Sequence, residues 1–397
     1  MEASVRTRDT LSTPITTPSA DISGDTSQDI NPWSVTGAIV DGKPQAINYN
    51  HLVETFGTRL ITGDLLQRFK QVTGHEPHVF MRRGLVFSHR DLETILDRHE
   101  KGQPFYLYTG RGPSNVFDVP LVIMMTDDEK FLFGKKAYTM DEMRTFVRGN
   151  ARDILAVGFD PKKTFLFSDF EFMGAKPSLA STTGIDSVGK AHFVSVQTSA
   201  SFATTFPHIF GTNTGETSEI PSLIPCAIDQ DPYFRVCRDV APRLGYAKPS
   251  LLHAKFFPAL QGPGSKMSAS VDSSAIFMSD TRKQIEKKIN KYAFSGGRET
   301  AEEQRRLGGD PDVDVAYQYL SFFTEDDEEL KRIEEAYRKG EMLTGELKKK
   351  CILKLQDFIG AFQTRRASID DAVLDEFMTV RPLVWGTKKG DPNGETK

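Results

Sequence analysis

Six short apolar runs, separated by stretches with helical character, constrain the fold of this chain more than any other feature. Runs of this length bounded by polar turns are typical of buried strands. Helices between successive strands favour a parallel arrangement, so we predict an α/β fold with a doubly wound parallel sheet. The predicted strands are Phe105–Tyr108, Val119–Met125, Thr164–Ser168, His192–Gln197, Leu223–Ala227 and Leu251–Phe257.

Capping residues and amphipathic patterns predict the helices. Thr126-Asp127-Asp128-Glu129 has the spacing of a capping box, and Asp231-Pro232 combines a capping carboxylate with proline at the first helical position. Residues 50–101 have a helical pattern with a short extended insert, in which Ser88 is a candidate cap for a helix ending at Gly102. Basic amphipathic segments predict three later helices, Thr281–Ala293, Glu328–Arg338 and Thr344–Ser368.

Composition excludes several classes of protein. The 397 residues are 38% hydrophobic and 26% charged, which is typical of a globular protein. The net charge of -4 gives no overall attraction to nucleic acid, so a nucleic-acid site must come from local basic clusters and we expect no DNA partner. No apolar run is long enough for a bilayer, and the N-terminus has no apolar signal core. Three scattered cysteines favour a reducing compartment, so we expect a cytoplasmic protein without a membrane partner.

A lysine-bearing loop is the strongest chemical signal. Lys266-Met267-Ser268-Ala269-Ser270 follow the flexible stretch 262–265. A mobile lysine loop can close over a triphosphate and neutralise charge as it moves to the leaving pyrophosphate. Lys266, Ser268 and Ser270 are therefore the candidate catalytic residues, with Met267 packing to position the loop. The alternative is an ordinary surface loop that carries a lysine.

Five motifs occur in an order that resembles a known family. They are Tyr108–Ser114, Thr126–Lys130, Ala227–Phe234, Lys266–Ser270 and Phe294–Arg298. The lysine loop has the signature of class I aminoacyl-tRNA synthetases, and the whole set resembles the eukaryotic cytoplasmic-type tryptophanyl-tRNA synthetases. The resemblance extends from about residue 32 to about residue 385.

This resemblance implies a domain organisation. A Rossmann-like class I synthetase catalytic domain would span residues 104–280, after an N-terminal extension at 32–103. An α-helical anticodon-binding domain would follow at 281–386. Residues 1–31, rich in Ser, Thr, Asp and Pro, are predicted to form a disordered tail, and residues 387–397 a flexible one. The resemblance also implies a homodimer.

The activity implied by the resemblance has two steps. Tryptophan is activated with ATP to tryptophanyl-adenylate, releasing pyrophosphate, and is then transferred to tryptophan tRNA. The first step is an in-line displacement at the α-phosphate, in which the protein positions the carboxylate and stabilises phosphate charge while Mg²⁺ helps to neutralise the triphosphate. ATP and Mg²⁺ are thus the implied cofactors, and no protein side chain is predicted to bind a metal.

The resemblance assigns four residues to tryptophan. Tyr108 would place its hydroxyl near the indole nitrogen, Glu129 would face the ammonium group, and Gln197 and Gln230 would contact the amino acid. Each has an ordinary alternative: a half-buried core tyrosine, the last residue of a capping box, and polar loop residues. The ATP-binding residues would be Arg111, Asp229, Lys266, Met267 and Ser268, although Arg111 also fits an exposed turn.

Basic clusters could contact tRNA phosphates, although each cluster alone is more often a solvated helix face. They lie at Lys287-Lys288-Lys291, Arg305-Arg306, Lys348–Lys350 and Arg365-Arg366. Asp312 and Asp314 fall where the family reads the anticodon.

Two blocks of the family pattern are absent. The His-x-Gly-His motif and its helix belong between Phe105–Tyr108 and Val119–Met125, which should be parallel neighbours. Only residues 109–118 are available, which is short for a parallel crossover. We expect lost adenine and phosphate contacts and one uncovered face of the sheet. The second block follows Gly174, where residues 175–189 have no helical pattern. Met124 also replaces a polar residue of relatives.

Three functions fit these observations. The first is a tryptophan–tRNA ligase. The alternative is a catalytically impaired truncated isoform or relative that only binds tRNA or a partner chain, which the absent motif favours. A nucleotidylyltransferase with another acceptor is disfavoured by the long helical region after residue 281.

Overall fold

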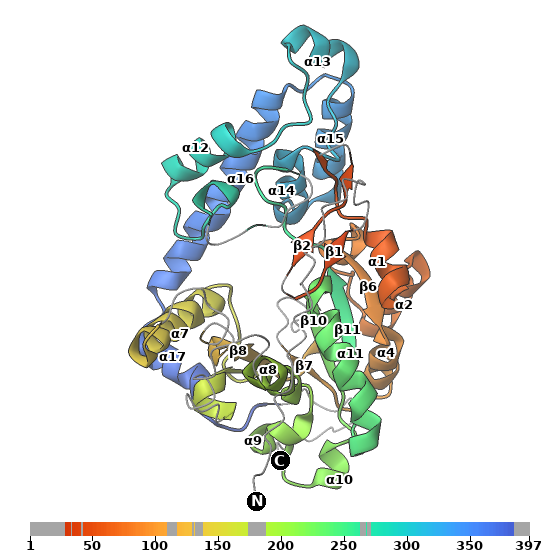
Figure 1. Cartoon of the computed structure of the whole chain (residues 1–397), viewed down its shortest axis with the longest axis vertical. Coiled ribbons are helices and arrows are strands. Elements are labelled where there is room, and N and C mark those ends of the chain that lie inside the picture. Colours follow the sequence, from red (N-terminus) through yellow and green to blue (C-terminus); the bar gives the residue numbers. More distant parts are fainter. Residues whose placement is uncertain are drawn as a thin grey trace, which may run out of the picture.

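The computed structural model describes residues 28–32, 34–40, 43–108, 117–128, 131, 138–173, 188–262, 267 and 271–384. These residues form a sheet region and a helical region, with a long helix running from the second towards the first (Figure 1). The main sheet has seven strands in the order β5-β6-β11-β10-β7-β8-β9. Their bounds are Arg59–Leu60 (β5), Val86–Arg90 (β6), Ser250–Ala254 (β11), Ser222–Ala227 (β10), Tyr106–Tyr108 (β7), Leu121–Met125 (β8) and Thr164–Ser168 (β9).

The predicted α/β class is confirmed. Strands β11, β10, β7, β8 and β9 pair in parallel, and β5 and β6 are added antiparallel. Five of the six predicted strands are present. The sixth prediction, His192–Gln197, is wrong, because this segment lies in helix α8 (Val188–Ser199).

The region before the parallel strands contains strands as well as helices. Helices α1 (Tyr49–Phe56), α2 (Gly63–Thr73), α3 (Val79–Arg82) and α4 (Leu92–Glu100) alternate with β5 and β6. The prediction that Ser88 caps a helix is wrong: Ser88 lies inside β6, and α4 begins after Asp91. Two short hairpins precede α1. They pair Asp29–Ile30 (β1) with Val35–Thr36 (β2), and Ile39–Val40 (β3) with Lys43–Pro44 (β4). Residues 28–31 of the predicted disordered tail are thus ordered at β1.

Both faces of the central strands are buried, so the expected uncovered face is not observed. All five residues of β8 are buried. On one face Leu107, Leu121 and Ile123 share a core with α2, α4, α7 (Met140–Leu155) and α17 (Asp371–Met378). On the other face Tyr106 and Val122 share a core that includes α11 (Asp231–Val240). Helices from distant parts of the sequence therefore cover strands β7 and β8, which are parallel neighbours as predicted.

The helical region has its own core. It contains α12 (Arg282–Tyr292), α13 (Ala301–Leu307), α14 (Val315–Phe323), α15 (Asp327–Arg338) and α16 (Thr344–Ala367), which confirms the three predicted helices within a few residues. Leu260, Tyr319, Leu347 and Leu355 are among the buried residues of this core. After α16 the chain returns to the sheet, where α17 packs against α7 and β9 (Figure 1).

The remaining elements are short. They are η1 (Asp169–Met173), η3 (Ala203–Thr205), α9 (Pro207–Phe210), α10 (Thr214–Thr217), η4 (Ile228–Gln230), η5 (Ala241–Leu244) and η6 (Asp272–Ser274). Among the described residues, no helix combines the length and apolar character needed to span a bilayer. The domain boundaries stay predictions. Strands β5 and β6 from the first segment belong to the main sheet, and α17 from the last segment belongs to its core.

Candidate active site

The carboxyl ends of the parallel strands meet at one edge of the sheet, where open α/β sheets bind ligands. Tyr108 ends β7, Met125 ends β8, and η4 with Gln230 follows β10 directly. Strand β7 pairs with β10 on one side and with β8 on the other. Side chains from three neighbouring strands therefore come together at this edge.

Tyr108 is fixed within the core of the edge. Its side chain is 1% exposed, and its ring lies edge-on to Phe234 with ring centroids 6.0 Å apart. The hydroxyl donates to the backbone oxygen of Gln197 at 2.6 Å and lies 3.4 Å from Met124 Sδ. Burial raises the pKa of Tyr108, so the phenol stays neutral at physiological pH. Because its one proton is used, the hydroxyl can only accept from a further partner.

Gln197 and Gln230 are joined across the edge. Gln197 Nε2 donates to Gln230 Oε1 at 3.1 Å. Gln197 Oε1 is buried and has no hydrogen-bond partner in the described part of the chain. A buried acceptor without a partner costs free energy, which a ligand N–H would recover. Tyr108, Gln197 and Gln230 are thus brought together, although Gln197 comes from a helix and not from the predicted strand end.

Asp229 lies on the other side of the same turn. It is 4% exposed and belongs to η4, whose Ile228 is fully buried. Tyr49 of α1 is nearby. Burial and, to a lesser extent, the charge of Asp229 raise its pKa to about 12. A hydrogen bond that Phe256 N donates to the Tyr49 hydroxyl, at 3.0 Å, acts in the opposite direction. Helix α1 therefore lies close to the turn that carries Asp229 and Gln230.

A buried polar chain holds the start of α11. Arg90 of β6 binds Asp231 with both Nε and Nη2, at 2.7 and 2.8 Å. His253 Nε2 lies 3.0 Å from the same carboxylate, and Ser88 Oγ lies 3.0 Å from His253 Nδ1. The prediction that Asp231 caps the helix is therefore wrong, because the capping position is Gln230. Spacing could not have identified Arg90 and His253, since three separate segments supply the network.

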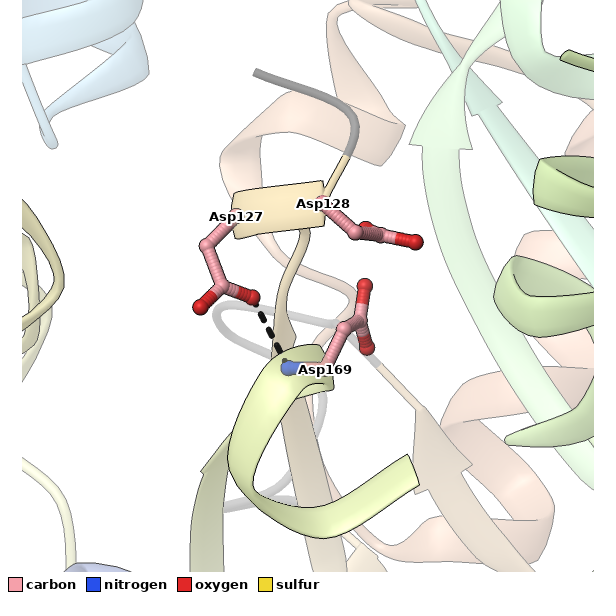
Figure 2. Close-up of side chains that lie close together, drawn as sticks. All are labelled: Asp127, Asp128 and Asp169. Carbon is pink, nitrogen blue, oxygen red and sulfur yellow. Dashed lines mark hydrogen bonds between the residues drawn. The ribbon is translucent and has the colours of Figure 1, made fainter. Parts of the chain in front are cut away.

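Three carboxylates gather at the ends of β8 and β9. Ligand atoms of Asp127, Asp128 and Asp169 lie within 4.8 Å of one another, and all three residues are buried. Figure 2 shows one oxygen of Asp127 accepting from the backbone nitrogen of Asp169, at 2.9 Å. Its other oxygen accepts from Ser168 Oγ. Burial raises the pKa of Asp127, against these hydrogen bonds.

Several predicted site residues lie outside the described residues. They are Lys266, Ser268, Ser270, Arg111 and Glu129, together with the interval 109–116 and residues 174–187. Met267 is described. Its backbone nitrogen donates to Phe257 O at 3.4 Å, and its side chain packs against the core of the helical region. Met267 itself is thus attached to that core.

Some residues of the predicted tRNA clusters have internal partners. Lys288 is 4% exposed and binds Asp272 and Asp280, at 2.8 and 2.9 Å. Lys348 donates to Ala293 O at 2.9 Å. Because they are occupied within the fold, these two lysines are poor candidates for phosphate contacts.

Asp314 also has a structural role. Its carboxylate accepts from the backbone nitrogens of Ala316 and Gly296, both at 2.9 Å, and from Tyr337 Oη at 2.9 Å. It is completely buried. Asp314 therefore caps α14, and a direct contact between its carboxylate and an anticodon base does not fit this arrangement. Asp312 is exposed and pairs with Arg338.

Comparison with known proteins first identifies the class of protein to which the chain belongs. A family model described as "tRNA synthetases class I (W and Y)" matches residues 219–360. The chain is 52% identical to the cytoplasmic tryptophan–tRNA ligase of Saccharomyces cerevisiae, over 91% of each protein. It is 47% identical to the human cytoplasmic tryptophan–tRNA ligase, covering 89% of this chain and 81% of that one.

Solved structures agree with this class. The tryptophanyl-tRNA synthetase from Giardia lamblia superimposes with a TM-score of 0.75 and 37% identity, covering 83% of this chain and 95% of that chain. This chain belongs to the cytoplasmic tryptophanyl-tRNA synthetase family, which confirms the resemblance of its motifs.

The comparison with the yeast ligase also shows a difference in length within the matched region. It runs over 399 positions but takes in 91% of a chain of 397 residues. Roughly 40 positions of the yeast protein therefore have no counterpart here. The yeast relative therefore has additional residues within the aligned region.

Proposed function

We propose that this chain is a cytoplasmic tryptophan–tRNA ligase, which forms tryptophanyl-adenylate from tryptophan and ATP and transfers the amino acid to tryptophan tRNA. The observation that carries this function is the 52% identity with an enzyme of that name across 91% of the chain. The alternative, a chain that only binds tRNA or a partner, gains no support from the comparisons.

The tryptophan side of the proposed site is formed by Tyr108, Glu129, Gln197 and Gln230. Tyr108 Oη donates to Gln197 O, so its lone pairs are left to accept the indole N–H. Gln197 Oε1 is a second buried acceptor, suited to the ammonium group beside Glu129. A site built around an indole N–H rejects phenylalanine, because binding phenylalanine would leave these acceptors unpaired.

The ATP side is formed by Arg111, Asp229, Lys266, Met267 and Ser268. The tryptophan carboxylate attacks the α-phosphate, the bond to the bridging oxygen breaks, and pyrophosphate leaves. Lys266, with Ser268 and Ser270, stabilises the charge that moves onto the leaving group. Met267 supports this role because its side chain packs against the core of the helical region.

Mg²⁺ supplies charge neutralisation when it enters with ATP, and it is bound largely by phosphate oxygens and water. The carboxylates of Asp127, Asp128 and Asp169 lie close together, and that of Asp127 has a structural role at the ends of β8 and β9. Both oxygens of Asp127 already accept hydrogen bonds from Ser168 and Asp169. We therefore propose no protein ligand for this ion.

The helical region is proposed to bind the tRNA, and the functional unit is proposed to be a homodimer, as the resemblance implies. Exposed basic residues such as Arg305 and Lys287 remain suited to phosphate contacts. Lys288 and Lys348 are left out of this proposal because of their internal partners.

Tryptophan-dependent exchange of labelled pyrophosphate into ATP tests this function. We expect exchange by the purified chain, and a loss of roughly 100-fold or more in Lys266→Ala, because transition-state charge is no longer neutralised. Lys101→Ala is the matched control, since Lys101 is exposed at the end of α4 and should leave exchange unchanged.

A second protein, with the additional positions of the yeast relative restored, completes the experiment. Exchange in neither protein would contradict the proposed function. Exchange in the restored protein alone would contradict it for this chain and would assign the activity to the absent segment.

A further inference from the structure

Arg83, directly after α3, enters the junction between α14 and α15 of the helical region. Its side chain is 11% exposed. Nη1 donates to the backbone oxygens of Ser321 and Thr324, at 2.7 and 2.6 Å, and Nη2 donates to Glu325 O at 3.3 Å. Nε donates to Asp327 Oδ1 at 2.7 Å. One guanidinium therefore binds three carbonyls and a carboxylate.

This position is that of a helix cap supplied by another part of the chain. The last carbonyls of a helix have no partner within it and carry the negative end of its dipole. Ser321 belongs to the last turn of α14, and Thr324 follows the helix as its C-cap residue. The planar fork of arginine suits several acceptors at once, which a lysine would not match. Arg83 thus caps the C-terminal end of α14 and also pairs with Asp327, the first residue of α15.

An aromatic contact extends the junction towards the lysine loop. Phe80 of α3 lies edge-on to Phe322 of α14, with ring centroids 5.5 Å apart. Phe322 in turn contacts Phe257 at 4.7 Å, and Phe257 O accepts from Met267 N. On the same helix, Tyr319 Oη donates to Pro258 O at 3.0 Å. Helix α14 therefore lies between α3 and the segment that leads into the loop.

The helical region has a second attachment at the far end of α16. Arg365 Nε donates to Ala156 O at 2.7 Å, and Arg366 pairs with Asp153 at the end of α7. Figure 1 shows this end of α16 beside α7, away from α14 and α15. Contacts at two separated places restrict rotation of the helical region against the sheet.

We propose that Arg83 is a positioning residue for tRNA charging: it fixes the orientation of the helical region, so that a tRNA bound there presents its acceptor end to the adenylate. This inference rests on the proposed ligase function. A ligand that contacts two bodies binds more tightly when their relative orientation is already set, because less freedom is lost on binding. Among the described residues, Tyr108, Gln197 and Gln230 make no hydrogen bond to α3, α14 or α15, so the tryptophan side of the site does not depend on this contact.

The test compares both half-reactions in Arg83→Ala. We expect the KM for tRNA in aminoacylation to rise about 3- to 30-fold. The KM for tryptophan in pyrophosphate exchange should stay within about twofold. Thermal melting checks that the variant is folded. Arg82→Ala is the matched control, because Arg82 shares Asp327 but makes no contact with the carbonyls of α14. It should change the KM for tRNA less.

Two further variants keep the test informative if Arg83→Ala is poorly folded. Asp327→Asn retains the carbonyl contacts and should have a small effect, whereas Arg83→Lys should not restore charging because it lacks the fork. Unchanged charging in Arg83→Ala, or a parallel fall of exchange and charging, would overturn the inference. No charging by the unaltered chain would instead contradict the ligase function on which the inference rests.

Discussion

At the scale of single residues, the polar chain through Asp231 lies directly after the turn that carries Asp229 and Gln230. Burial alone would raise the pKa of Asp231, but hydrogen bonds from Arg90 and His253 lower it to about 2. Burial lowers the pKa of His253, against the attraction of Asp231. At physiological pH the network therefore contains a charged Arg90–Asp231 pair and a neutral His253.

Arg90→Met is expected to destabilise the protein by about 3–5 kcal/mol at neutral pH, because it leaves a buried carboxylate without its partner. The pH dependence also has a defined sign. The pKa of Asp231 is below its usual 3.8, so its contribution is present above about pH 4 and is lost as the pH falls towards 2. Without Arg90, burial raises the pKa of Asp231, so the penalty of the unpaired carboxylate should shrink as the pH falls and Asp231 becomes protonated. Urea unfolding from pH 7 to 2 measures both effects.

Arg144→Met is the control for this experiment. Arg144 pairs with Asp141 on the surface, where the two side chains are 64% and 93% exposed. Exposed pairs contribute at most about 1 kcal/mol. Equal losses in the two variants would show that the buried network has no special role in stability.

At the scale of elements, the motif Phe294–Arg298 is explained by close packing. A methyl group on Gly296 would lie 1.9 Å from Asp310 O, while Gly296 N donates to Asp314 and Gly296 O accepts from Asp310 N. The backbone at Gly296 and the backbone at Asp310 cannot move apart without losing these hydrogen bonds. Glycine at this position therefore lets the chain after α12 lie against the segment before α14.

Gly296→Ala should destabilise the protein by about 1–3 kcal/mol, since overpacking forces the backbone apart. Gly360→Ala is the opposite case, because its new methyl group meets nothing within 4 Å inside α16. That change should stabilise by up to about 1 kcal/mol. Chemical unfolding of the two variants should give shifts of opposite sign; a loss at both positions would contradict the packing argument.

Local pattern predicted most elements but not their partners. The strands from Phe105 to Ala254 were predicted because apolar runs between turns are a local signal. The strand predicted at His192–Gln197 is wrong because the two buried residues of this segment, Phe193 and Val196, have the i, i+3 spacing of a helix face, and Phe193 packs against Tyr233 of α11. The antiparallel pairing of β6 with β11, and Gln197 opposite Gln230, depend on segments far apart in sequence. Tyr108 and Gln230 were predictable as strand-end residues, whereas Arg83 and Arg90 had no local signal.

At the scale of the whole molecule, the last helix completes the sheet region. Leu374 and Phe377 of α17 are 0% and 4% exposed and belong to the same core as Leu107 and Leu121. Arg148 and Arg152 of α7 add ion pairs to Asp371. The helical region is therefore inserted between two parts of one core.

Phe377→Ala should destabilise the sheet region by about 3–5 kcal/mol, because it leaves a cavity in that core. Val380→Ala, only three residues away and 53% exposed, should change stability by no more than about 0.5 kcal/mol. Calorimetric melting distinguishes the two. Similar small effects would indicate that α17 is a peripheral contact.

This return of the chain has a consequence for biosynthesis. Leu383 is buried with Tyr106 and Tyr108, and Val384 N donates to Lys162 O at 2.8 Å. The ribosome releases β7, β8 and β9 long before it releases these partners. Helices α12 to α16, whose core is nearly contiguous in sequence, can fold on the nascent chain while the unfinished sheet still exposes apolar surface. We therefore expect chaperones that bind during translation to engage the strands until residue 384 has emerged.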